Sequence, residues 1–196
     1  MIRAQLSVVS AAVILGLSGA AMAADFTEGF DTIAVTPASA RVPAGWSQVN
    51  NSAPVAPLGW RPLTGFTTPP PTQAGANAIV ANFQAGAGVS DLSLWLISPV
   101  ATWNNGDTVS FWTRSLNPVG GGFADRLQVR LSSNGGIDVG TTSTSVGDFT
   151  NLLIDINPDL LIAGPTSYPN DYTQFSITVA GLPSGGASGA LSFRYF

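Results

Sequence analysis

Two stretches of the chain alternate apolar and polar residues with the period of two that a half-buried β-strand has. The residues of one parity in these stretches are Leu127, Val129 and Leu131 in the first, and Phe175, Ile177 and Val179 in the second. Because alternate side chains of a strand point to opposite faces, both sets are predicted to face the core. Arg126, Gln128 and Arg130 are predicted to face outward.

Segments of strand length, rich in β-branched and aromatic residues, recur along the chain between clusters of Gly, Pro, Asn and Asp. About ten strands are predicted in this way: Phe26–Asp31, Gly45–Asn50, Gly59–Phe66, Ala78–Phe83, Leu92–Ser98, Thr108–Arg114, Arg126–Leu131, Phe149–Ile156, Thr173–Val179 and Leu191–Phe196. The polar segment 138–148 and the Gly/Ser-rich segment 181–189 are predicted to be loops. Since helical periodicity is nearly absent, the pattern predicts an all-β, antiparallel β-sandwich. A jelly roll is the expected topology, and an immunoglobulin-type Greek key is the alternative.

The N-terminal segment has the pattern of a secretory signal peptide. Arg3 supplies a positive charge, Val8 to Leu17 is a short apolar run, and Ala21-Met22-Ala23 is a small-x-small cleavage site. The alternative, a membrane anchor, is less favoured because the apolar run is too short to span about 30 Å comfortably. The sequence therefore predicts an exported protein, with a signal peptide at 1–23 and a single sandwich domain at 24–196.

Composition excludes several kinds of chemistry. Of the 196 residues only 9% are charged, the formal net charge is −4, and there is no His or Cys; the seven basic residues are all Arg. Catalytic Ser-His-Asp or Cys-His sets, disulfides, iron–sulfur clusters and the usual tetrahedral zinc sites are therefore ruled out. The negative balance also argues against binding to nucleic acid, which needs a basic face.

The acidic residues suggest one candidate metal site. Glu28 and Asp31 lie three residues apart, and Asn82 and Asp171 could each add a side-chain oxygen if folding brings them close. Oxygen ligands of this kind suit Ca²⁺, and a bound calcium ion would stabilise an exported chain without disulfides. The alternative is that these groups only solvate turns and strand ends. No specific pair of carboxylates stands out among the ten Asp, so catalysis by an acid pair is not expected.

Four aromatic residues are candidates for ligand binding. Trp46 and Trp60 lie beside Gly and Pro in irregular stretches, and Tyr168 and Tyr172 lie in or beside the loop that follows Pro165. Exposed Trp and Tyr side chains suit stacking on sugar rings or contact with a protein partner. Packing in the core is the alternative for each of them, and it is the expectation for Trp95 and Trp112, which lie in apolar strands.

The order of several segments resembles a known family. These segments are Glu28-Gly29-Phe30-Asp31, Trp46, Leu94–Pro99, Val109–Arg114, Asp125–Ser132, Phe175–Val179 and Phe193–Phe196. Together they resemble the bacterial choice-of-anchor J family, which is related to the cleaved-adhesin domain, over nearly all of residues 25–196. The resemblance implies a jelly roll of the galactose-binding or MAM-like type, usually non-catalytic and often with a structural Ca²⁺. Its members are secreted or held at the surface by a C-terminal anchor such as a PEP-CTERM tail.

The chain departs from the family at its C-terminus. It stops at Phe196 without a sorting motif or hydrophobic tail, and the family adds one more strand after this point. We therefore expect a chain truncated at its C-terminal end, with an unpaired strand edge and with any envelope anchor outside this sequence.

Taken together, the sequence predicts a non-catalytic exported binding or adhesion module, secreted or associated with the cell surface or extracellular matrix. Its expected partner is an extracellular glycan or protein, and neither nucleic acid nor a direct membrane contact is expected. The alternative is a carbohydrate-binding domain of a secreted carbohydrate-active protein.

Overall fold

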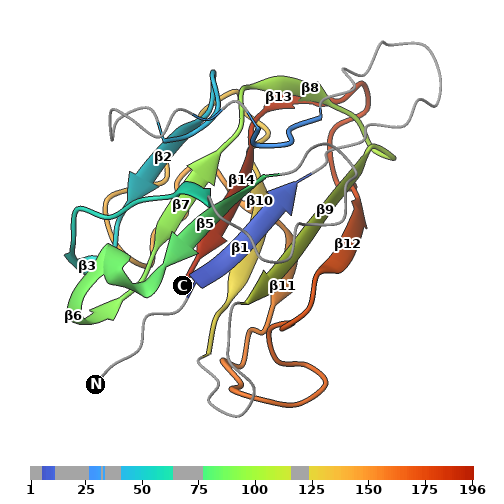
Figure 1. The fold of residues 1–196 in the computed structure, drawn as a ribbon. Helices are drawn as coiled ribbons and strands as arrows, with labels where there is room; N and C mark the ends of the chain where they lie inside the picture. The colour runs from blue at the N-terminus through green and yellow to red at the C-terminus, as the bar shows by residue number, and fades with distance from the viewer. Residues whose placement is uncertain (1–5, 12–26, 32, 34–40, 64–76, 116–123) are drawn as a thin grey trace.

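The computed structural model describes residues 6–11, 27–31, 33, 41–63, 77–115 and 124–196 (Figure 1). The strands are β1 (Leu6–Ala11), β2 (Ser47–Asn50), β3 (Ala53–Val55), β4 (Arg61–Leu63), β5 (Ala78–Asn82), β6 (Gly86–Asp91), β7 (Leu94–Ile97), β8 (Ala101–Trp103), β9 (Thr108–Ser115), β10 (Leu127–Leu131), β11 (Asn151–Ile156), β12 (Thr173–Thr178), β13 (Ala187–Gly189) and β14 (Leu191–Tyr195). The helical element among the described residues is a 3-10 turn, Phe83–Ala85.

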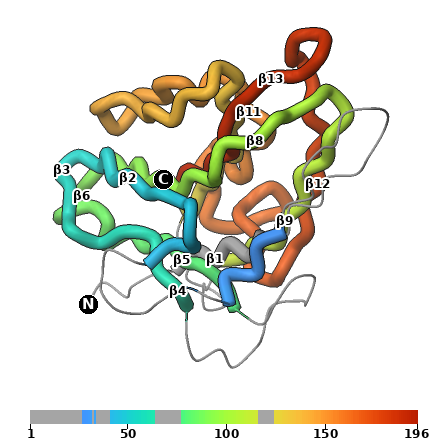
Figure 2. Tube along the Cα trace, turned by 90° about the horizontal axis from the view of Figure 1, so that it is seen from above, coloured from blue at the N-terminus to red at the C-terminus, as the bar shows by residue number. Residues whose placement is uncertain are grey.

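Two five-stranded antiparallel sheets form the body of the molecule (Figures 1 and 2). The first sheet has the strand order β12-β9-β1-β5-β4, and the second has the order β11-β10-β14-β7-β2. Two-stranded pairs, β3 with β6 and β8 with β13, extend this arrangement. The predicted all-β antiparallel sandwich is confirmed, and consecutive strands repeatedly cross from one sheet to the other.

The main core lies between the two sheets. Phe111 of β9 meets Phe193 of β14 edge to face, with ring centroids 5.3 Å apart, and also stacks on Phe175 of β12. The inward-facing residues predicted for β10 are all buried, and Phe175 and Ile177 of β12 pack against the same cluster. The period-two pattern therefore identified the core face of these strands correctly.

A second apolar cluster covers the other face of the second sheet. Trp95 and Ile97 of β7 pack there against Val139 and Phe149, and the ring centroids of Trp95 and Phe149 are 5.6 Å apart. Val139 belongs to the segment 138–148, which contains no strand, as predicted. This loop nevertheless folds back over the sheet, so residues predicted to face solvent are partly covered.

Several details of the predicted strands are wrong. The described part of Phe26–Asp31 contains no strand, and β3, β6, β8 and β13 were not predicted. Most of the unpredicted strands are short, and some consist of small residues, so they show no apolar alternation. In β13, Gly189 passes so close to the backbone of Ser132 that a Cβ atom there would collide with its carbonyl oxygen. The close approach of the chain to Ser132 therefore requires glycine at position 189.

Strand β1 comes from the predicted signal peptide. It pairs antiparallel with β5, where Val8 lies opposite Val80, and with β9, where Val9 lies opposite Thr113. The structure thus places Leu6–Ala11 in the middle of the first sheet, while cleavage after Ala23 stays a prediction. Within the described part of the chain, no helix has the length and apolar character needed to cross a membrane.

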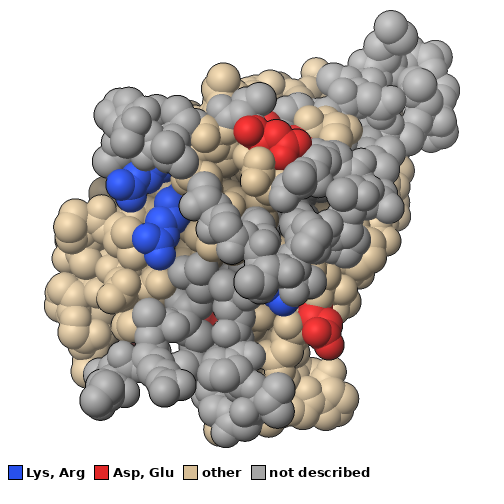
Figure 3. Space-filling view, viewed as in Figure 1, with Lys and Arg blue, Asp and Glu red and all other residues tan. Residues whose placement is uncertain are grey.

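Charges are sparse on the side of the molecule turned to the viewer in Figure 1. In the space-filling view of this side, the described acidic and basic side chains lie in small separate groups (Figure 3). The denser group of arginines lies instead on the second sheet, where it lines a pocket.

Candidate functional site

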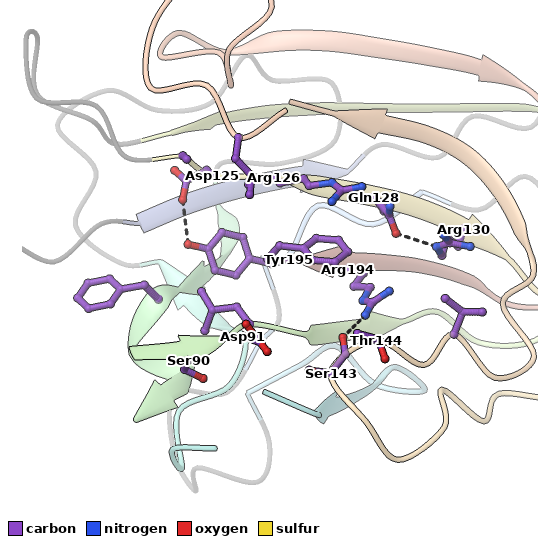
Figure 4. A pocket seen from close by; sticks show the side chains of 16 residues that line it. Ser90, Asp91, Asp125, Arg126, Gln128, Arg130, Ser143, Thr144, Arg194 and Tyr195 are labelled. Carbon is purple, nitrogen blue, oxygen red and sulfur yellow. Dashed lines mark hydrogen bonds between the residues drawn. The ribbon is translucent and has the colours of Figure 1, made fainter. Parts of the chain in front are cut away.

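A pocket of about 750 Å³ lies over the outer face of the second sheet (Figure 4). Strands β10 and β14 form its floor, and Ser143, Thr144 and Val146 of the covering loop form one wall. Its charged and polar floor consists of Arg126, Gln128, Arg130 and Arg194. Three of the seven arginines of the chain therefore meet in one place.

Strand register explains why these side chains meet. Gln128 of β10 lies opposite Arg194 of β14. Residues two apart on a strand point to the same face, so Arg126 and Arg130 flank Gln128 and lie diagonal to Arg194. Diagonal neighbours on an antiparallel pair are about 7–8 Å apart, which is within reach of long side chains.

Arg126 has a carboxylate partner. Its Nε and Nη2 donate to the two carboxylate oxygens of Asp155 at 2.8 and 2.6 Å, and Nε2 of Gln128 donates to the same group at 2.7 Å. Burial acts to raise the pKa of Asp155, but the hydrogen bonds from Arg126 and Gln128 outweigh it, so the pKa is lowered. The hydrogen bond with Asp155 correspondingly raises the pKa of Arg126. At this end of the pocket, Arg126 and Asp155 therefore form a hydrogen-bonded ion pair that carries no net charge.

Arg194 is buried without a carboxylate partner among the described residues. Its side chain is 3% exposed, its Nε donates to Oγ of Ser93 at 3.1 Å, and its Nη2 donates to the carbonyl oxygen of Ser143. The guanidinium also lies over the rings of Trp95 and Phe196, at 4.7 and 4.4 Å from their centroids. Burial, together with repulsion from Arg130 and Arg126, lowers its pKa to about 10. That value is far above neutral pH, so Arg194 stays charged.

Arg130 lies beside Arg194, is half-buried, and also donates its hydrogen bonds to neutral acceptors. Its Nε donates to Oε1 of Gln128 at 2.8 Å and its Nη1 donates to the carbonyl oxygen of Phe149 at 3.1 Å. Burial, with a contribution from Arg126, lowers the pKa of Arg130. Among the described residues of this floor, the salt bridge is that of Arg126 with Asp155, so Arg130 and Arg194 form a positively charged pair held by neutral acceptors.

The remaining walls are mixed. Leu92, Leu160 and Phe196 give the pocket apolar surface, and Ser90 and Asp91 place polar groups at its edge. At one end, the carboxylate of Asp125 is turned to the protein interior, where it accepts hydrogen bonds from Ser115 and Tyr195 at 2.7 and 2.8 Å. It is a structural group that fixes β14 against the end of β9.

The aromatic residues predicted to bind ligand lie elsewhere. Trp46 and Trp60 are buried, the first against Phe30 and the second donating from Nε1 to the carbonyl oxygen of Leu94 at 3.3 Å. Tyr168 is also buried, and its hydroxyl lies 2.6 Å from Oγ1 of Thr113. These three side chains face the core rather than the surface, in accordance with the packing alternative.

Tyr172, the fourth of these residues, is half-buried. Its ring lies under the guanidinium of Arg114, which is 4.8 Å from the ring centroid. Burial raises the pKa of its hydroxyl. The structure does not bring Tyr172 to the arginine-lined pocket, and its role in ligand binding stays a prediction.

The four residues predicted to hold calcium are engaged in separate interactions. Glu28 accepts a hydrogen bond from the backbone N–H of Phe30 at 2.6 Å, and Asp31 accepts one from Asn77 at 2.9 Å. Asn82 is buried and caps the 3-10 turn through the N–H of Gln84, while Asp171 is exposed. Burial, with a smaller contribution from Asp31, raises the pKa of Glu28. No group of three His, Cys, Asp or Glu converges among the residues that the structure describes, and calcium binding stays untested.

The arginine-lined pocket was not predicted from the sequence. Arg126 and Arg130 were recognised only as outward-facing residues of a strand, and Arg194 was not singled out. The usable signal was the concentration of Arg and Gln on one face of two apolar strands in a chain with few charges. It was not decisive, because the pairing of β10 with β14 is not visible in the sequence.

No family model matches the chain, and no curated protein matches it. Among solved structures, the chain is similar to the K3 cleaved adhesin domain of Lys-gingipain from Porphyromonas gingivalis w83, with 20% sequence identity and a TM-score of 0.43. The match covers 80% of this chain and 82% of that chain. Membership of the choice-of-anchor J family stays a prediction.

Proposed function

We propose that this protein is a non-catalytic, exported binding module of the adhesion type that holds an anionic group of its ligand in the arginine-lined pocket. The observation that carries the proposal is the pair Arg130 and Arg194, two charged guanidiniums side by side in a concave site, whose own hydrogen-bond acceptors among the described residues are all neutral. Bringing together like charges is unfavourable, and an anion bound between them would relieve the repulsion. The N–H donors of an arginine guanidinium can bind two oxygens of a planar or tetrahedral anion at once, so this pair suits such anions.

The absence of catalytic groups supports binding rather than turnover. The chain has no His, Cys or Lys, so its Ser and Thr hydroxyls have none of the usual bases beside them. The carboxylate of Asp155 is already bound by Arg126 and Gln128, and that of Asp125 is turned inward. Export rests on the predicted signal peptide.

Binding of acidic polymers to the full chain tests this proposal. We would immobilise the chain and measure binding of polyglutamate, dextran sulfate and polygalacturonate by biolayer interferometry, with neutral dextran as the reference. At least one acidic polymer is expected to bind, and Arg130→Gln is expected to weaken it about tenfold or more because a charge-assisted contact is lost. The matched control is Arg61→Gln, which makes the same charge change on β4 of the other sheet. Equal loss in both variants, or no binding at all, would refute the proposal.

A further inference from the structure

We infer that the anionic group held by Arg130 and Arg194 is the carboxylate of a sugar acid, a uronic acid residue of an acidic glycan. This inference rests on the proposed function and names its ligand class. It follows from three features of the pocket: the unused donors of the two arginines, the carboxylate already bound on the same floor, and the composition of the walls.

The two arginines have donors to spare. A guanidinium carries five N–H bonds, and each of these side chains makes two hydrogen bonds in the structure. Arg194 cannot move away to find solvent, because its guanidinium lies against Trp95 and Phe196 and is almost fully buried. Its remaining donors are therefore available only to a group that enters the pocket.

The neighbouring part of the floor shows which group fits. Arg126 holds Asp155 through two parallel hydrogen bonds while Gln128 adds a third donor. Arg126 lies two residues before Gln128 on β10 and Arg130 lies two residues after it. Arg194 of β14 lies opposite Gln128. On this side Gln128 presents Oε1, which already accepts from Nε of Arg130, so a second carboxylate would be held by the remaining Nη donors of Arg130 and Arg194. Its single negative charge would lie between the two guanidiniums.

The walls favour a sugar as the carrier of that carboxylate. The hydroxyls of Ser90, Ser143 and Thr144 and the carboxylate of Asp91 line the pocket with small donors and acceptors, which suit the hydroxyls of a sugar ring. Leu92 and Val146 offer apolar surface for its C–H bonds. A cavity of about 750 Å³ is far larger than an inorganic ion and lies in the range of small-molecule sites.

Calorimetric titration of the full chain distinguishes the sugar acid from other anions. The probes are a galacturonate disaccharide, the corresponding neutral galactose disaccharide, galactose 6-sulfate and N-acetylglutamate. The uronate is expected to bind about tenfold or more tightly than each of the other three. Arg130→Gln and Arg194→Lys are both expected to weaken uronate binding about tenfold or more, since each loses part of a two-point contact. Arg61→Gln should bind as the unmodified chain does, and melting curves of all variants show whether each is folded.

The possible negative results distinguish a wrong uronate assignment from a wrong proposed function. If the sulfate or N-acetylglutamate binds as well as the uronate and Arg130→Gln weakens it, the pocket is an anion site and the uronate inference is wrong, while the proposed function stands. If uronate binds but neither pocket variant weakens it, the inference is also wrong, because the sugar acid lies elsewhere. If no probe binds in a way that depends on Arg130, both are refuted.

Discussion

The contact that joins the two sheets predicts a large and local effect on stability. Phe111 is fully buried in β9, and its ring packs on Phe193 across the sandwich and on Phe175 within its own sheet. Replacing it by Ala removes a ring from a site that backbone strands enclose on both sides, so the cavity can collapse only in part. We expect Phe111→Ala to reduce the free energy of unfolding by about 3–5 kcal/mol.

Thermal denaturation followed by circular dichroism measures this loss. For a domain of this size, each kcal/mol corresponds to about 2–4 °C in Tm, so the expected decrease is roughly 6–20 °C. Two variants serve as controls. Phe175→Ala removes the same ring from a half-buried position and should cost clearly less, and Val89→Ala changes a fully exposed residue and should cost no more than about 0.5 kcal/mol.

Two outcomes would contradict the reasoning. If Phe111→Ala costs less than about 1 kcal/mol, the ring does not fill the space between the sheets as the structure places it. If Phe175→Ala costs as much as Phe111→Ala, the decisive packing lies within the first sheet rather than between the two. Phe111→Leu, which keeps most of the apolar volume, should retain most of the stability in either case.

Three further predictions follow from other contacts. Asp155→Asn should reduce the free energy of unfolding by about 1–3 kcal/mol at pH 7. The pKa of Asp155 in the folded protein lies below its ordinary value of 3.8, so its stabilising effect is present above pH 3.8 and is lost as the pH falls through the folded-state pKa. The unfolding curves of the variant and the parent protein should therefore converge in acid. Gly189→Ala should cost about 1–3 kcal/mol in urea unfolding, because its Cβ would collide with the backbone of Ser132, and an unchanged midpoint would contradict the close approach. In a chain without native cysteines, Val8→Cys combined with Val80→Cys should form a disulfide in the uncleaved protein, and free thiols after mild oxidation would contradict the pairing of β1 with β5.

The sequence predicted those strands that bury one face in the core, because burial of one face makes apolar and polar residues alternate with a period of two. Strands such as β10 and β12 bury one face against many partners, so their apolar residues had to recur at every second position. Strands such as β13 pair through the backbone and leave no such pattern. Local composition therefore identified most strands of the two large sheets, but it missed β1, which was interpreted as part of a signal peptide, and the strands β3, β6, β8 and β13 of the two-stranded pairs.

The candidate site escaped prediction because it depends on strand order. Gln128 reads as an outward-facing polar residue, yet it is buried, since the loop 138–148 folds over it and β14 brings Arg194 beside it. Arg194 and Gln128 are far apart in the sequence, and no local rule pairs them. The burial of Trp60 shows the reverse case. Its position beside Gly and Pro in an irregular stretch made it a candidate for ligand binding, with core packing as the alternative, and it fills the core and donates to the backbone of β7.

The segment Leu6–Ala11 shows why one stretch of sequence can support two interpretations. A signal peptide needs a short apolar run, and a central strand favours apolar, β-branched residues. Leu6–Ala11 overlaps the beginning of the apolar run Val8 to Leu17 and also contains two adjacent Val residues. In the structure this segment separates β5 from β9 and satisfies the backbone groups of both. Cleavage after Ala23 would leave those two strands with facing, unpaired edges in the middle of the first sheet, where open edges invite pairing with another strand. Cleavage after Ala23, which stays a prediction, would therefore remove the strand that joins β5 to β9 in the first sheet.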